Sequence, residues 1–182
     1  MTGLWTVDPD EYLAALPTLP LCAPKRSPPT KYEVSRWPLL KAFHGFSGIE
    51  RRRGGQLAGW LLNAGCITMP KQCNICASPG PLGLHGENYY DVSRDPALCA
   101  RCHRALHLRP FHWDAWRRIV DASARTGREW FALAPRNGLD LADHLRRKFG
   151  SQVADIERSS LLPLPDAIAV LLPGNMLHHP DL

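Results

Sequence analysis

The chain has 182 residues, 17 of them proline, and a formal charge of +5. This length suits one domain of ordinary size with extensions, and the proline content predicts irregular connections. The positive charge favours an anionic partner, most simply a nucleic acid. No stretch is apolar enough to span a bilayer, and no apolar run follows a basic start. We therefore expect a cytoplasmic protein with no membrane partner.

Two helices are predicted in the N-terminal half, and each carries a capping signal. The first covers residues 8–16, with Asp8 as its cap, and a proline-rich linker follows it. The second begins after Ser47, which forms a capping box with Glu50, and it ends at Gly65. Three successive arginines lie near its start, where the helix dipole disfavours cations, so they are either nucleic-acid contacts or a solvated face. These are Arg51, Arg52 and Arg53.

Two pairs of the form Cys-x-x-Cys lie in the middle of the chain, with 22 residues between them. Four thiolates in this arrangement fill the positions of a tetrahedral Zn²⁺ ion, and a site with no open position is structural. The predicted ligands are Cys73, Cys76, Cys99 and Cys102. Of the two other cysteines, Cys66 is an alternative ligand. We expect it to be a reduced, partly buried thiol instead, because nothing in the sequence supports a disulfide framework.

A ββα order is predicted around the second cysteine pair. Residues 82–85 favour a short strand ending at His85, and residues 96–98 favour its partner. A helix is predicted over residues 102–108. We therefore expect the histidine at the end of the first strand to lie near this helix.

Three histidines can form a second site on these elements. His103 and His107 are one helical turn apart, so both can face the strand end that carries His85. Such imidazoles can bind a divalent ion such as Mg²⁺ and leave positions open for water or a phosphate oxygen. A neutral imidazole nearby can deprotonate the attacking water, and Glu87 is a further candidate ligand or base. The alternative is that the histidines are polar groups around the cysteine zinc.

The closing segment of this stretch follows the pattern Leu-Cys-x-x-Cys-His-x-x-x-His from Leu98 to His107, and the middle segment runs from His85 to Tyr89. Together with the first cysteine pair, these segments resemble the zinc-stabilised branch of the HNH endonuclease family, which has a ββα-metal core. The resemblance covers the stretch from Cys73 to His107, about 35 of the 182 residues. It implies a metal-dependent enzyme that hydrolyses phosphodiester bonds.

The resemblance also assigns roles residue by residue. His107 is the better candidate for the catalytic ion, and His103 matches the other helix position. His85 matches the first histidine of the family's pair, which is normally a metal ligand. Gly86 stands where the family has its general base, so His85 or Glu87 takes that role or catalysis has been lost. The family's central asparagine has no clear match.

Two more helices are predicted in the C-terminal half. One covers residues 112–126 and ends at Gly127, and the other covers residues 138–149 with Asn137 as its cap. The tail is apolar but broken by prolines. We expect its segment 161–172 to pack on the body of the protein or to meet a partner, in a homo-oligomer or a complex with another protein.

The sequence thus predicts an α+β fold: a mostly helical body with a central ββα-metal, treble-clef-like zinc module and irregular proline-rich extensions. The best functional hypothesis is a zinc protein with an HNH-like core that acts as a DNA endonuclease. The alternatives are a catalytically inactive DNA- or RNA-binding or adaptor protein and, third, a protein-interaction module. In addition to the three arginines of the second helix, the predicted phosphate contacts are Arg101, Arg104 and Arg109. The predicted segments are 1–30, 31–72, 73–109, 110–150 and 151–182.

Overall fold

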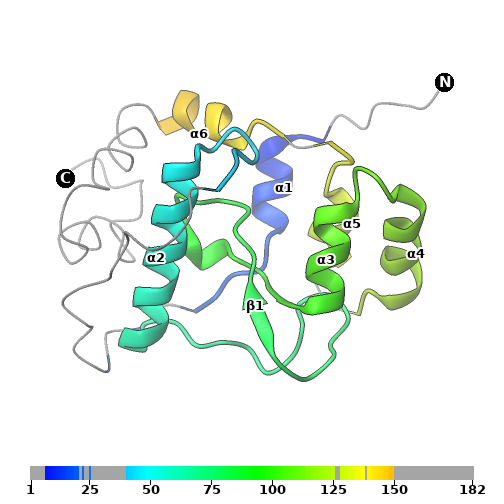
Figure 1. Cartoon of the computed structure of the whole chain (residues 1–182), viewed down its shortest axis with the longest axis horizontal. Coiled ribbons are helices and arrows are strands. Elements are labelled where there is room, and N and C mark those ends of the chain that lie inside the picture. The colour runs from blue at the N-terminus through cyan, green and yellow to red at the C-terminus, as the bar shows by residue number, and fades with distance from the viewer. Residues whose placement is uncertain are drawn as a thin grey trace. The chain divides into compact units, whose positions relative to one another are not determined.

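The computed structural model describes residues 7–20, 22, 25, 40–125, 128–137 and 139–149. Within these ranges the chain has an α+β fold with six α-helices and a two-stranded antiparallel sheet (Figure 1). The apolar tail with its segment 161–172 lies outside the described residues, and so does most of the proline-rich linker. None of the described helices is both long enough and apolar enough to cross a membrane.

The chain divides into two compact units, and each is built from segments that are distant in sequence. The first unit takes its described residues from Met1–Thr18, Met69–His85 and Arg94–Leu139. The second takes them from Leu19–Thr68, Gly86–Ser93 and Asp140–Leu182. The five consecutive segments predicted from the sequence therefore do not coincide with the compact units. A 3-10 turn, Val92–Arg94, lies where the chain passes between them.

The first unit begins with helix α1, Pro9–Ala15. The Asp8 side chain accepts hydrogen bonds from the backbone N–H groups of Asp10 and Glu11, at 2.9 and 3.0 Å, as predicted for its cap. Tyr12 is fully buried, and α1 packs against helix α5, Arg128–Leu133.

The sheet of the first unit is a short hairpin that leads directly into a helix. Strand β1, Leu82–Leu84, pairs with strand β2, Ala97–Cys99, so that Gly83 lies opposite Leu98. Helix α3, Ala100–Leu108, follows β2 without a connecting loop and packs against both strands. The predicted ββα order is confirmed, with the helix beginning two residues earlier than expected.

Helix α4, Trp113–Ser123, is shorter than predicted, and α5 after it was not predicted at all. Ala124 leaves the helix in an extended conformation. The backbone N–H of Arg125 then donates to the carbonyl of Ile75 at 2.6 Å, so the chain bonds to the first cysteine loop instead of continuing the helix. Trp116 on α4 packs against Phe131 on α5 with ring centroids 3.8 Å apart. Trp116 is buried and forms part of the core of this unit.

The second unit contains helices α2, Gly48–Ala64, and α6, Leu141–Phe149. The predicted capping box is present at the start of α2, and Gly65 ends it in the left-handed region at φ +72°. The prediction for α6 was wrong at its start. The Asp140 carboxylate accepts the backbone N–H of Asp143 at 2.9 Å, so the helix is capped at Asp140 and not at Asn137.

A buried carboxylate joins the elements of the second unit. Glu50 is 1 % exposed and accepts hydrogen bonds from the Ser47 backbone N–H at 2.6 Å, from the Tyr90 hydroxyl and from Arg146 at 2.5 Å. Burial acts to raise the pKa of Glu50, but these hydrogen bonds together outweigh it and hold the pKa below the ordinary value. The charged carboxylate therefore ties α2 to α6 and to the segment that carries Tyr90.

Replacing Glu50 with Gln should reduce the free energy of unfolding at pH 7 by about 1–3 kcal/mol, because hydrogen bonds to a buried charged group are lost. The folded-state pKa of Glu50 lies below 4.5, so its contribution is complete above that pH and is lost as the pH falls through the folded pKa. The difference between wild type and variant in urea unfolding should therefore shrink below about pH 4.5. An equal difference at pH 7 and at pH 3 would contradict this role.

Candidate metal centres

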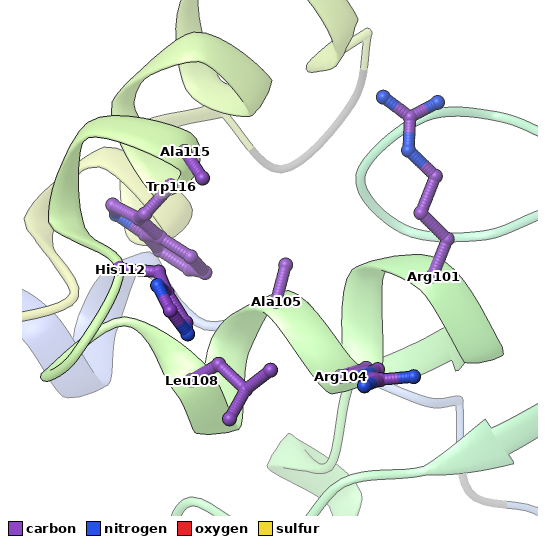
Figure 2. A pocket seen from close by; sticks show the side chains of 7 residues that line it. All are labelled: Arg101, Arg104, Ala105, Leu108, His112, Ala115 and Trp116. Carbon is purple, nitrogen blue, oxygen red and sulfur yellow. The ribbon is translucent and has the colours of Figure 1, made fainter.

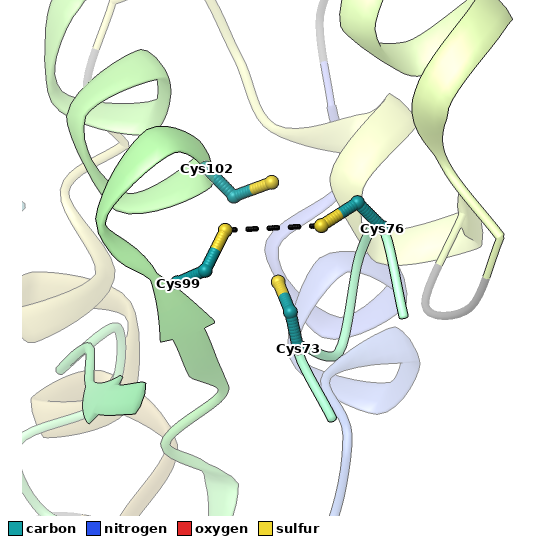
Figure 3. Close-up of side chains that lie close together, drawn as sticks. All are labelled: Cys73, Cys76, Cys99 and Cys102. Carbon is teal, nitrogen blue, oxygen red and sulfur yellow. Dashed lines mark hydrogen bonds between the residues drawn. The ribbon is translucent and has the colours of Figure 1, made fainter. Parts of the chain in front are cut away.

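The four cysteines of the predicted zinc site come together in the first unit (Figure 3). Cys73 and Cys76 lie in a tight loop in which the Cys73 backbone N–H donates to Ser78 and its carbonyl accepts from Ala77, both at 3.0 Å. Cys99 is the last residue of β2 and Cys102 lies in the first turn of α3. One pair therefore comes from a loop and the other from the junction of strand and helix.

The geometry of the four sulfur atoms fits a tetrahedral zinc ion. All four Sγ atoms lie within 4.8 Å of one another, and those of Cys76 and Cys99 are 3.7 Å apart. Zn–S bonds of about 2.3 Å in a tetrahedron place neighbouring sulfurs roughly 3.8 Å apart. These residues are therefore close enough together to hold a zinc ion.

The cluster favours the thiolate form of one cysteine, whereas a metal site requires thiolates from all four. A hydrogen bond from Cys102, helped by backbone N–H groups, lowers the pKa of Cys73 far below its ordinary value, although burial opposes this. The same bond, together with burial, raises the pKa of Cys102. One buried sulfur thus carries the negative charge and its neighbour the proton, which a bound cation would displace.

Asn74 holds the two halves of this cluster together, a role that the sequence did not reveal. Its backbone N–H donates to the carbonyl of Ala97 at 2.9 Å, and its side-chain oxygen accepts the Ala97 N–H at 2.7 Å. The first cysteine loop is thereby bonded to β2 directly. In the sequence, the only indication of this role is that the asparagine follows a ligand cysteine.

The three histidines also come together, as the spacing predicted. His85 follows β1, and its backbone N–H donates to Pro96 at 2.9 Å. His103 and His107 lie on α3, with their rings stacked 5.0 Å apart. Nδ1 of His85 is 3.1 Å from Nε2 of His103, and one ring nitrogen from each of the three lies within 4.8 Å of the others.

This histidine cluster fits a second metal ion with open positions. Ligand atoms about 2.1 Å from an ion lie roughly 3.0–3.4 Å apart, which matches the separation between His85 and His103. Three protein ligands leave room for water or a substrate oxygen. Without an ion, the same distance suits a hydrogen bond between two neutral imidazoles, whose direction depends on the tautomer.

The structure explains why residue 86 is a glycine. A Cβ atom at this position would lie 2.5 Å from Cε1 of Tyr89, so a side chain here would collide with the ring. The Tyr89 hydroxyl in turn accepts a hydrogen bond from Arg51 at 3.0 Å. A histidine at position 86 would require both groups to move.

Glu87 is not among the groups that cluster with the three histidines. Its side chain is fully buried, and its Oε2 atom lies 3.0 Å from Nε2 of His44, which is fully buried too. His44 adopts the left-handed conformation at φ +51°, which is uncommon outside glycine. Nothing in the sequence pointed to His44, because its partner lies 43 residues away in the chain.

The predicted phosphate contacts fall into two sets. Arg101 and Arg104 are exposed on α3. Arg109 is 2 % exposed, and its guanidinium donates to the carbonyls of Leu106 and Pro135, both at 2.6 Å. In α2, Arg53 is buried, which lowers its pKa, and Arg51 is engaged with Tyr89, while Arg52 is half-buried. The structure therefore presents the α3 pair to solvent and places Arg53 and Arg109 inside the fold.

Replacing Cys99 with Ser should abolish zinc binding, because three sulfurs leave the tetrahedral site incomplete. Metal analysis of purified protein should show about one zinc per chain in the wild type and little in the variant, together with a lower thermal midpoint. Cys22→Ser is the matched control, since this exposed thiol lies outside the cluster. Equal zinc content in wild type and Cys99→Ser would refute the site.

Replacing His103 with Ala should weaken the binding of a second divalent ion by roughly tenfold or more while leaving the cysteine zinc in place. Isothermal titration of the zinc-loaded protein with Co²⁺ measures this. His144→Ala on α6 is the control, because it lies outside the histidine cluster. Failure of the wild type to bind any ion beyond zinc would refute the histidine cluster as a metal site.

No model of a known protein family, no curated protein and no solved structure matches this chain. The likeness to the HNH endonuclease family therefore depends on the chain's own features. These are the sequence pattern between Cys73 and His107, the four-cysteine cluster, and the order β1, β2, α3.

Proposed function

We propose that this protein is a metal-dependent DNA endonuclease whose HNH-like core hydrolyses phosphodiester bonds. The observation that carries the proposal is the convergence of His85, His103 and His107 on one ββα unit. The same unit contains a cysteine cluster that can hold a structural zinc. A plain zinc-binding scaffold has no need of three imidazoles whose ring nitrogens lie within 4.8 Å of one another.

The scaffold explains how the site would be held in place. Cys99 and Cys102 flank the start of α3, so a zinc ion shared with the first cysteine pair would fix the helix relative to the hairpin. His103 and His107 follow on that helix, while His85 leaves the opposite strand of the hairpin. The relative positions of the three imidazoles therefore depend on the cysteine cluster.

The chemistry follows from the three side chains. A divalent ion such as Mg²⁺, when bound here, would supply positive charge to the scissile phosphate and the leaving oxygen. In this proposal His107, the exposed member, and His103 would hold the ion. His85 is the residue that we assign to accept the proton of the attacking water, because Gly86 lacks a side chain and Glu87 is paired with His44. Arg101 and Arg104 would neutralise backbone phosphates nearby.

One observation favours a second candidate function, a zinc-dependent nucleic-acid-binding protein without catalysis. The family resemblance places the general base at position 86, and here a glycine packs against Tyr89 in the space where that side chain would lie. His85 is also only 3 % exposed. In this alternative the fold and the arginines of α3 remain useful for binding, and the histidines hold no catalytic ion.

The nuclease proposal predicts cleavage of plasmid DNA by the zinc-loaded protein in the presence of Mg²⁺ or Mn²⁺. His107→Ala should abolish cleavage, and His85→Ala should slow it by roughly 10²–10⁴-fold, the usual contribution of a general base. Gel analysis of cleavage time courses checks both, with zinc content measured in parallel.

His144→Ala serves as the control and should cleave at the wild-type rate. Cleavage that persists in His107→Ala would come from a contaminant or another site, and it would refute the assignment. A wild-type protein that binds DNA in a salt-dependent manner and never cleaves it would support the inactive binding protein instead.

A further inference from the structure

A groove in the first unit lies between helices α3 and α4 and includes Arg101 and Arg104 of the nuclease proposal, but none of its three histidines (Figure 2). It has a volume of about 240 Å³. Figure 2 shows Trp116 and His112 on one side, with Arg104 and Arg101 beyond Ala105 on the other. Pockets for whole drug-sized ligands are usually larger, roughly 300–1,000 Å³. The groove therefore suits a single ring or side chain of a larger partner.

A second hollow of about 430 Å³ continues from this groove around the turn between α3 and α4. The two share His112 and Ala115. The second is bordered by Phe111 and Trp113, and two more arginines, Arg118 and Arg136, lie on its edge. Together they form a surface, the α3–α4 groove, that contains both aromatic side chains and cations.

Phe111 is the most exposed large apolar side chain among the described residues, and it lies on this surface. It is 78 % exposed, whereas the other exposed large apolar side chains among the described residues, Leu40 and Ile49, are 44 % and 40 % exposed. The backbone that carries it is ordered, because the backbone N–H groups of Phe111 and His112 donate to the carbonyl of Leu108 at 3.0 and 2.9 Å. A solvent-exposed aromatic ring on an ordered turn is suited to stack on a flat partner.

The charges around the groove favour an anionic partner. Arg101, Arg104, Arg118 and Arg136 line it, and Asp114 is its one carboxylate. Arg101 donates to Ser123 at 3.2 Å and Arg136 to Pro110 at 3.3 Å, so both long side chains are partly ordered along the rim. Cations flanking an apolar floor can contact a charged backbone while its flat apolar groups lie on the aromatic rings.

The geometry points to the α3–α4 groove as a binding surface for single-stranded nucleic acid, with an unpaired base stacked on Phe111 and the phosphates along the arginines. Single-strand-binding proteins combine a cationic groove with aromatic stacking in this way, because every base has a flat face. An acidic peptide shares the charge but supplies no regular series of flat rings, so the exposed Phe111 favours the nucleic acid.

The groove is also connected to the histidine site by helix α3. Arg104 and His107 are three residues apart and therefore neighbours on the surface of the helix. A strand lying in the groove would pass over Arg104 to reach the three imidazoles. This step rests on the proposed nuclease function and gives it a substrate class, a DNA strand that is locally unpaired. The binding itself requires no catalysis.

Fluorescence anisotropy with a labelled single-stranded oligonucleotide of about 12 nucleotides and a duplex of the same sequence tests the groove directly. No divalent ion is added, so cleavage does not interfere. Phe111→Ala should weaken single-strand binding by roughly 5- to 100-fold and change duplex binding by less than about twofold. Phe111→Tyr, which keeps the ring, should retain affinity, and Leu40→Ala should have no effect.

Two further measurements sharpen the test. The double variant Arg101→Gln with Arg104→Gln should reduce the slope of log affinity against log salt by about 1.4, whereas Arg147→Gln on α6 should leave the slope unchanged. Ultraviolet crosslinking of an oligonucleotide containing 5-iodouracil should map to the peptide that carries Phe111.

The outcomes separate the groove from the nuclease proposal. If the protein cleaves plasmid DNA but Phe111→Ala binds single strands as tightly as wild type, the groove proposal is refuted and the nuclease proposal is not. Binding that depends on Phe111 without any cleavage would support the groove and count against the nuclease. Displacement by polyglutamate that depends on Phe111, with no oligonucleotide binding, would overturn the groove as a nucleic-acid surface and assign it to an acidic peptide.

Discussion

The approach of four cysteine sulfurs is the constraint on which the first unit depends. Cys73 and Cys76 come from a loop, and Cys99 and Cys102 from a strand end and a helix start, so one tetrahedral ion would join elements that are distant in sequence. The loop is additionally bonded to β2 through Asn74. With strands of three residues, this hairpin would be marginal without such a fastening.

Three different faces of helix α3 contribute to three different sites. Cys102 faces the cysteine cluster, His103 and His107 face the end of β1, and Arg101, Ala105 and Leu108 line the groove against α4. A single helix of nine residues thus sets the position of the structural site, of the proposed catalytic site and of the proposed strand-binding surface. A shift of the helix would change all three together, which is why a rigid anchor at its start matters.

The second unit explains the main departure from the family pattern. Gly86 lies against the ring of Tyr89, whose hydroxyl is bonded to Arg51, and Glu87 is buried against His44. The position of the expected base and the residue after it are therefore both packed against other residues of this unit. If the protein cleaves DNA, the proton must be accepted by His85 or a neighbouring imidazole, because the glycine cannot do so.

The sequence determined the local features whose causes are local. Spacing identified the four cysteines and the three histidines, and capping residues placed the starts of α1 and α2, because ligand geometry and helix caps act over a few residues. Tertiary structure decided what depends on distant partners. It ended α4 early by bonding Arg125 to Ile75, buried Arg109 against Pro135 and paired Glu87 with His44. It also exposed Phe111, since only the packing of α3 and α4 shows which aromatic side chains remain at the surface.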